Sequence, residues 1–213
     1  MKKIILDLCG GTGAWSRPYA EDVRFDVRVI TLPRYNIFDT IINDNTITFF
    51  DRIDGREMTI EKSDIYGILA APTCTMFSLA RTTAKTPRDF EQGMELVECC
   101  LRIIWAVRAY KDSNLRFWAL ENPRAYLRQF LGVPPLTFTA DEFGGNIKKP
   151  TDIWGYFNIP KKCKTNEGKP LAYANLPIIP EGYILPPDLS KTAVRKAITN
   201  AAFAKAFYKA NSR

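Results

Sequence analysis

A cysteine and a glutamate each stand at the end of an apolar run, next to a proline. Cys74 lies two residues after Pro72 in "ILAAPTCTMFS" (residues 68–78), and Glu121 precedes Asn122 and Pro123 in "ALENP". Each run is typical of a buried strand that stops at the edge of a sheet, where ligands bind in open α/β proteins. The chain contains no histidine, so acid–base chemistry there would fall to carboxylates, lysines or water. The alternative for Cys74 is a small apolar packing residue.

A glycine-rich loop follows the first apolar run, in "KIILDLCGGTG" (residues 3–13). Glycines let the backbone approach a ligand closely, and a helix start after the loop favours a polar or anionic group. The spacing is not the dinucleotide-binding one, and the second strand ends at Thr31, where that kind of domain carries a carboxylate. A tight turn is the alternative reading. If the loop shares a sheet edge with Cys74 and Glu121, a ligand, a thiol and a carboxyl group converge.

The elements that would position these groups alternate along the chain, which predicts an α/β fold with a mainly parallel sheet flanked by helices. We expect strand ends at Leu8, Ala71 and Leu120 to meet at one edge. An Asp54-Gly55 pair predicts a small β-hairpin inserted before the strand that leads to Pro72. The strand segments are 3–8, 25–32, the run before Pro72, 115–123, 136–144 and 149–157.

Three helices are expected. The first is short and starts near Ala14. The longest lies within residues 86–111, with Thr86 as N-cap and Pro87 in the first turn, and its Cys99 and Cys100 are packing residues. A proline-rich loop over 160–187 precedes one amphipathic helix over 190–211.

Composition bounds the class of protein. With 213 residues, 46% of them hydrophobic, the chain suits one domain over residues 1–213. We find neither a membrane span nor a signal peptide. Five cysteines without metal-type spacing indicate neither a disulfide framework nor a metal site, and fit a reducing cytoplasm. The net charge of +7 favours a polyanionic partner such as nucleic acid, although it can also serve solubility alone.

Four motifs occur together in a recognisable order: "LDLCGGTGAW", "APTCTMFS", "ALENP" and "FGGNIKKPTDIWGYF". In this order and approximate spacing they resemble the cofactor loop, nucleophile loop, Glu-Asn motif and basic late-strand motif of DNA cytosine-5 methyltransferases. The chain is most similar to the small members of that kind encoded by bacteriophages, over most of residues 4–211. The resemblance implies a Rossmann-like methyltransferase fold, S-adenosylmethionine as cofactor, DNA as partner, a host cytoplasmic location and a role in DNA modification that evades restriction.

The resemblance also assigns roles to residues. Cys74 would be the nucleophile that adds to carbon 6 of cytosine, and Glu121 the acid at ring nitrogen 3, before carbon 5 takes the methyl group. This requires a raised pKa for Glu121 and a lowered pKa for Cys74. The expected cofactor-binding residues are Asp7, Leu8, Cys9, Gly10, Gly11, Gly13, Trp15, Thr31, Leu32, Asn36 and Pro72. The expected substrate-binding residues are Thr73, Ser78, Arg81, Asn122, Pro123, Lys148 and Lys149, whose basic members could equally be solvated surface charges.

The sequence departs from the family pattern at four places. Thr73 replaces a second proline before the cysteine. Thr31 and Asn36 stand where the family commonly has acidic residues that contact the cofactor, so weaker cofactor binding is expected. The late-strand motif is a loose Lys-Lys-Pro-Thr-Asp version.

The loop before the final helix is too short for a large target-recognition domain. We therefore expect cytosine methylation in DNA with little sequence preference. The alternatives are methylation of a free nucleotide or RNA, and a non-catalytic module that binds nucleic acid or a host defence protein.

Overall fold

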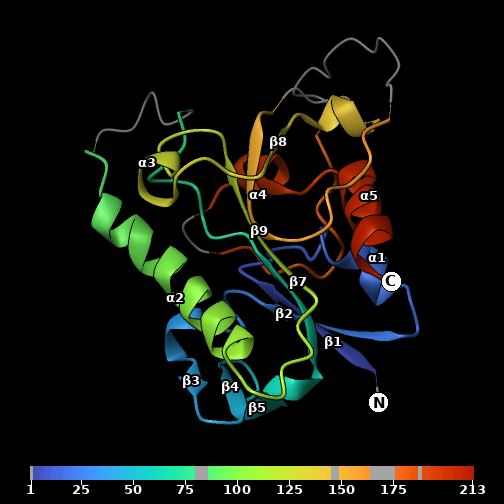
Figure 1. Cartoon of the computed structure of the whole chain (residues 1–213). Helices are drawn as coiled ribbons and strands as arrows, with labels where there is room; N and C mark the ends of the chain where they lie inside the picture. Colours follow the sequence, from blue (N-terminus) through green and yellow to red (C-terminus); the bar gives the residue numbers. More distant parts are fainter. Residues whose placement is uncertain (1, 80–85, 145–148, 164–175, 187–188) are drawn as a thin grey trace.

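A computed structural model describes residues 2–79, 86–144, 149–163, 176–186 and 189–213 (Figure 1). Its main sheet has six strands in the order β2-β1-β6-β7-β9-β8. The first four are mutually parallel, β9 runs antiparallel to β7, and β8 runs antiparallel to β9. The result is a mixed α/β fold with a mostly parallel central sheet. The strands are β1 (Lys3–Leu8), β2 (Phe25–Ile30), β6 (Ile65–Ala70), β7 (Phe117–Pro123), β8 (Leu136–Phe138) and β9 (Thr151–Tyr156).

Alternating side chains of the central strands fill a core on each face of the sheet. Leu6, Ile68 and Leu120 point to one face, where α2 (Phe90–Arg108) packs. Their neighbours Ile5, Leu69 and Ala119 point to the other, where α1 (Arg17–Ala20) and α5 (Ala201–Asn211) pack. Figure 1 shows α2 on one side of the sheet and α5 with α1 on the opposite side. Burial on both faces explains the nearly continuous apolar runs of these strands.

A second, antiparallel sheet lies between β2 and β6 in the chain. It consists of β3 (Ile41–Ile42), β4 (Thr46–Asp51) and β5 (Arg56–Glu61). Asp51 pairs with Arg56, and Gly55 between them has a φ of 65°, which glycine adopts without strain. Ile47, Phe49 and Ile60 join the same core as α2. Short 3-10 turns, η1 (Ile37–Asp39) and η2 (Lys62–Asp64), flank this sheet.

Strand β7 lies within the segment expected over 115–123 and ends at Pro123, not at Leu120, where the shared sheet edge was expected. It continues through Glu121 to Pro123, because these residues pair with β9, Pro123 opposite Thr151. Neighbouring β6 already ends at Ala70, whose partner is Leu120. Glu121 therefore lies on a strand that projects beyond its neighbour, rather than after a strand end.

The helix boundaries also differ from expectation. Helix α1 begins at Arg17, because the residues after Gly10 form consecutive turns. Helix α2 begins at Phe90 instead of near Thr86: the Asp89 carboxylate accepts a hydrogen bond from Gln92 N at 2.9 Å and caps it. Cys100 of α2 is buried in the core, as expected for a packing residue.

The final amphipathic segment forms two helices instead of one. Helix α4 (Lys191–Ala197) ends at Ile198, and α5 starts after Asn200. The Asn200 side chain accepts hydrogen bonds from Ala202 N (2.9 Å) and Phe203 N (3.2 Å). An asparagine that caps a new helix start interrupts the preceding one.

Two short elements complete the description. Helix α3 (Arg128–Leu131) follows β7, and the 3-10 turn η3 (Ala140–Phe143) follows β8, so the strand expected over 136–144 ends early.

Within the described ranges, no helix is both long and apolar enough to cross a bilayer.

Candidate functional site

A cavity of about 480 Å³ lies where the parallel strands β1, β2, β6 and β7 end. Gly11, Cys74 and Glu121, the three groups expected to converge, all line it. Of the residues named as site candidates from the sequence, those that line this cavity are Asp7, Cys9, Gly10, Gly11, Trp15, Thr31, Leu32, Asn36, Pro72, Thr73, Cys74, Glu121, Pro123 and Lys149.

The glycine loop is built around a buried carboxylate. Asp7 at the end of β1 is fully buried and accepts a hydrogen bond from the Ser16 hydroxyl at 2.5 Å. Its other oxygen, Oδ1, has no hydrogen-bond partner among the described residues. Burial raises the pKa of Asp7 to about 7, against the lowering effect of Ser16. A Cβ at Gly10 would lie 2.3 Å from the Asp7 carboxyl carbon, so only glycine fits there.

Thr31 and Asn36, where the sequence resemblance led us to expect weaker cofactor contacts, both make contacts within the chain. The Thr31 hydroxyl accepts a hydrogen bond from Gly11 N at 3.3 Å and so ties the end of β2 to the glycine loop. The Asn36 side chain accepts a hydrogen bond from Phe38 N at 3.2 Å and caps η1. Each side chain therefore has a structural partner while it lines the cavity.

Cys74, Glu121 and Lys149 form an electrostatically linked group. Burial raises the pKa of the Cys74 thiol, while the Lys149 ammonium lowers it and Glu121 raises it further. Burial also raises the pKa of Glu121, against the effect of Lys149. The direction for Glu121 agrees with the expectation from the sequence resemblance. The direction for Cys74 is opposite to that expectation, because burial outweighs the nearby cation.

The loop that carries Cys74 is joined to β7 by Asn122. This fully buried side chain donates from Nδ2 to the Pro72 carbonyl at 3.0 Å, so it supports the loop without lining the cavity. Next to it in the sheet, buried Asp152 accepts two hydrogen bonds from Arg128 at 2.5 and 2.6 Å. This pair anchors α3 to β9 beside Glu121, and Asp152 contributes to the raised pKa of Glu121.

Some candidate residues lie elsewhere. Leu8 is fully buried in the core, and Gly13 and Ser78 do not line the cavity. Arg81 and Lys148 lie outside the described residues. The structure therefore brings together most, but not all, of the residues named from the sequence.

The cavity also has walls that motif-based reasoning missed. Aromatic Tyr35 and Phe38 come from the segment after β2, Leu96 comes from α2, and Tyr183 comes from the segment before α4. Tyr183 faces the glycine loop, since a Cβ at Gly11 would lie 3.9 Å from its hydroxyl. The break between α4 and α5, at Ile198 and Thr199, completes this wall. No sequence motif marks these residues, because their position depends on how distant segments pack.

Comparison with known proteins does not assign a family. The chain matches no protein-family model, and no curated protein matches it significantly. Solved structures do match. One is the methyltransferase EhMeth of Entamoeba histolytica, at 8% identity and a TM-score of 0.42, over 83% of this chain and 60% of EhMeth. The chain thus spans less than two thirds of that protein, and likeness at this level assigns neither function nor substrate.

Proposed function

We propose that this protein transfers a methyl group from S-adenosylmethionine to carbon 5 of cytosine in DNA, with little intrinsic sequence specificity. The observation that carries the proposal is that Cys74, Glu121 and Lys149 line one cavity together with the glycine loop after β1. A thiol, a carboxyl group of raised pKa and an ammonium group are the types needed to add to, protonate and orient a pyrimidine ring.

The cavity has features that suit the cofactor. Its volume of about 480 Å³ is within the range of small-molecule sites. Asp7 Oδ1, which has no hydrogen-bond partner in the described part of the chain, can accept a hydrogen bond from the amino group of the ligand's methionine part. Gly10 keeps the loop free of a side chain beside that carboxylate. When bound, S-adenosylmethionine would supply an electrophilic methyl group.

In the proposed reaction, the chain's own residues activate the base. The Cys74 thiolate adds to carbon 6 of cytosine, while the Glu121 carboxyl group donates its proton to ring nitrogen 3, which gives carbon 5 its nucleophilic character. After carbon 5 is methylated, a water molecule takes the proton from carbon 5, and the electron pair of that C–H bond forms the double bond to carbon 6 and expels the Cys74 thiolate. Ring nitrogen 3 returns its proton to Glu121, which restores the aromatic ring and the starting state of both side chains. Lys149 favours the thiolate. Asn122 holds the loop that carries Cys74.

DNA is the proposed substrate on grounds of charge and size. A net charge of +7 favours a polyanion. The 34 residues from 157 to 190, between β9 and α4, are too few for a large domain that reads base sequence. A base in duplex DNA must leave the helical stack to reach a cavity of this kind.

Tritium transfer from labelled S-adenosylmethionine tests the proposal on four substrates: duplex DNA, single-stranded DNA, RNA and dCMP. We expect label in DNA with the wild type and none with Cys74→Ala. Label in RNA or dCMP alone would show that this molecule, and not DNA, is the substrate. No label in any of the four would reject methyl transfer.

DNA that carries 5-fluorocytosine tests the covalent step, because fluorine cannot leave carbon 5 as a proton. We expect a protein–DNA adduct only when S-adenosylmethionine is present, and none with Cys74→Ala. An active wild type that forms no adduct would contradict the mechanism.

A second candidate is a non-catalytic module that binds nucleic acid or a host defence protein. The contacts of Thr31 with Gly11 N and of Asn36 with Phe38 N favour it, because both side chains serve the fold where cofactor contacts are expected. Calorimetric titration with S-adenosylmethionine separates the two: no heat at millimolar ligand would favour the non-catalytic module.

A further inference from the structure

Among the described residues, three backbone carbonyls of the turn that carries Cys74 accept hydrogen bonds from elsewhere in the chain. Pro72 O accepts a hydrogen bond from Asn122, and Phe77 O accepts one from Tyr126 N at 3.3 Å, both from the β7 side. Met76 O accepts one from Arg88 Nη1 at 2.9 Å, from the α2 side. Within the turn, the amides of residues 77 and 78 donate to Cys74 O at 3.0 and 2.8 Å. The position of the thiol therefore depends on anchors from two different elements.

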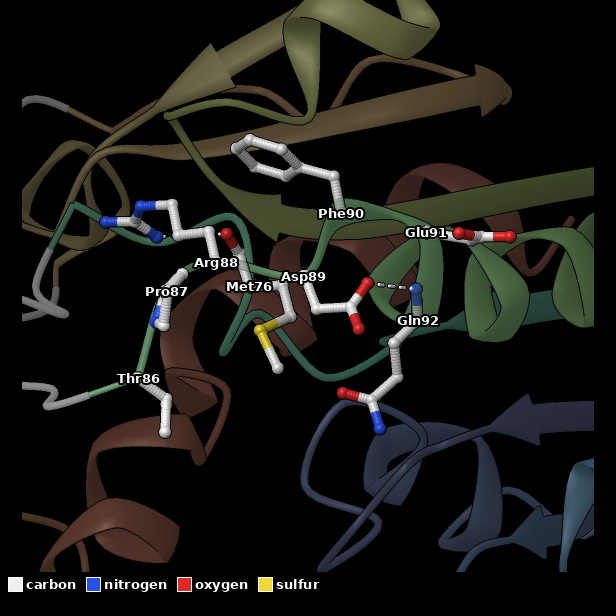
Figure 2. Close-up of a pocket in the computed structure, with 8 residues that line it drawn as sticks. All are labelled: Met76, Thr86, Pro87, Arg88, Asp89, Phe90, Glu91 and Gln92. Carbon is white, nitrogen blue, oxygen red and sulfur yellow. Dashed lines mark hydrogen bonds between the residues drawn. The ribbon is translucent and has the colours of Figure 1, made fainter.

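Arg88 is itself held in place. Its guanidinium lies over the Tyr126 ring, 4.8 Å from the ring centroid. Figure 2 shows that Arg88 points to the Met76 carbonyl, and that both residues line a second cavity of about 600 Å³. The side chain of the next residue, Asp89, points instead to the backbone amide of Gln92. Within the described ranges, no carboxylate lies within ion-pair distance of Arg88. Its charge is thus directed at a carbonyl, which makes the hydrogen bond charge-assisted.

The loop and the start of α2 are also closely packed. A Cβ at Gly93 would lie 2.9 Å from Met76 Cβ and 3.0 Å from Phe77 Cζ. The Phe77 ring is fully buried and stacks on Phe90, with 6.1 Å between ring centroids. A shift of the start of α2 would therefore be transmitted to the loop.

We propose that Arg88 is a positioning residue for Cys74, an inference that rests on the proposed nucleophilic role of that cysteine. Arg88 does not line the cavity that contains Cys74, so it acts through the Met76 carbonyl, two residues away. Without this donor, the turn loses the anchor at the Met76 carbonyl, and the thiol samples positions outside reach of the base. Misplacement by about 1 Å can cost a reaction about a hundredfold in rate.

The test compares Arg88→Met with Arg88→Lys, and with Arg102→Met as the control, since Arg102 is an exposed arginine of α2, the helix that begins just after Arg88. We expect Arg88→Met to lower kcat about tenfold or more and to slow adduct formation on fluorinated DNA equally. The KM for S-adenosylmethionine and the melting temperature should stay near wild type. Arg88→Lys should restore part of kcat, and Arg102→Met should resemble wild type. Wild-type kcat in Arg88→Met, or a kcat loss matched by the unfolded fraction, would overturn the proposal.

A second readout separates this proposal from the proposed function. The rate of Cys74 alkylation by iodoacetamide, followed by mass spectrometry of its peptide, needs no enzymatic activity. If the wild type transfers no methyl group, the proposed function fails, and the alkylation rate alone then tests the role of Arg88. A rate that changes severalfold in Arg88→Met but not in Arg102→Met supports the positioning role. Equal alkylation rates in Arg88→Met and wild type overturn it. If Arg88→Met does not fold, Arg88→Gln takes its place under the same criteria.

Discussion

At the scale of single residues, the protonation of Cys74 sets the conditions for chemistry. Burial raises the pKa of the thiol more than Lys149 lowers it. The resting group is therefore protonated near neutral pH, and the thiolate fraction increases as the pH rises. Reactivity that depends on the thiolate should increase in the same direction.

Lys149→Met should make Cys74 react more slowly. Without the ammonium, the pKa of the thiol rises further, so the thiolate fraction at about pH 8 falls and alkylation by iodoacetamide slows severalfold. The rate should still increase with pH in both proteins, with the mutant profile displaced to higher pH. Lys161→Met, at an exposed site outside the cavity, is the control. Identical profiles for Lys149→Met and wild type would show that Lys149 does not act on the thiol.

Glu121→Gln should separate binding from proton transfer. The amide can still donate a hydrogen bond but cannot give up a proton, so methyl transfer should fall by about 10²-fold to 10⁴-fold. The thermal shift caused by S-adenosylmethionine should remain. Single-turnover transfer to DNA measures the first effect, and a melting curve with and without ligand measures the second. A wild-type rate in this variant would remove Glu121 from the mechanism.

At the scale of elements, the Asn200 side chain separates α4 from α5 by capping the start of α5. Asn200→Ala removes the acceptor for two amides at the start of α5, and should lower the free energy of unfolding by about 1 kcal/mol. Asn200→Asp retains a capping oxygen and should stay close to wild type. Urea unfolding measures both. Equal loss in the two variants would mean that the capping hydrogen bonds are not what Asn200 contributes.

The positions of the strands followed from sequence patterns because the patterns are local. The run "KIILDL" coincides with β1, and apolar residues on both faces marked β6 and β7 as buried. The antiparallel pairing of the end of β7 with β9, nearly 30 residues later, could not be predicted in the same way, because no local pattern specifies which strand is the partner.

The same limit holds for the candidate site. The residues of the glycine loop, the Cys74 loop and "ALENP" could be named because strand ends meet at one sheet edge. Tyr183 and Leu96 could not be named from the sequence. They reach the cavity because the segment before α4 and the middle of α2 pack against it, and neither position is next to the end of a strand.

At the scale of the whole molecule, buried Asp7 should make stability depend on pH. The pKa of this carboxyl group is about 7 in the folded protein against an ordinary 3.8. Between pH 3.8 and about pH 7, Asp7 is protonated in the folded state and ionised in the unfolded state. The free energy of unfolding should therefore fall as the pH rises from about 4 to about 7, by up to a few kcal/mol.

Asp7→Asn should remove this pH dependence. The difference between wild type and Asp7→Asn in urea unfolding should grow over that interval and level off above about pH 8. Ser16→Ala should move the interval upward, because the Ser16 hydrogen bonds lower the pKa of Asp7. Parallel stability curves for wild type and Asp7→Asn would contradict the assigned ionisation.

The core between the main sheet and α5, which contains Trp15, also constrains the order in which the protein can fold during synthesis. Trp15 lies near the start of the chain, yet its ring contacts Phe203 and Phe207 of α5, with centroids 6.1 and 5.4 Å away. Until the ribosome has made α5, the sheet face that carries Phe25 and Phe117 has no cover from that helix. Between the synthesis of β7 and that of α5, the nascent chain therefore leaves this apolar face without its helix, and exposed apolar surface of this kind promotes aggregation.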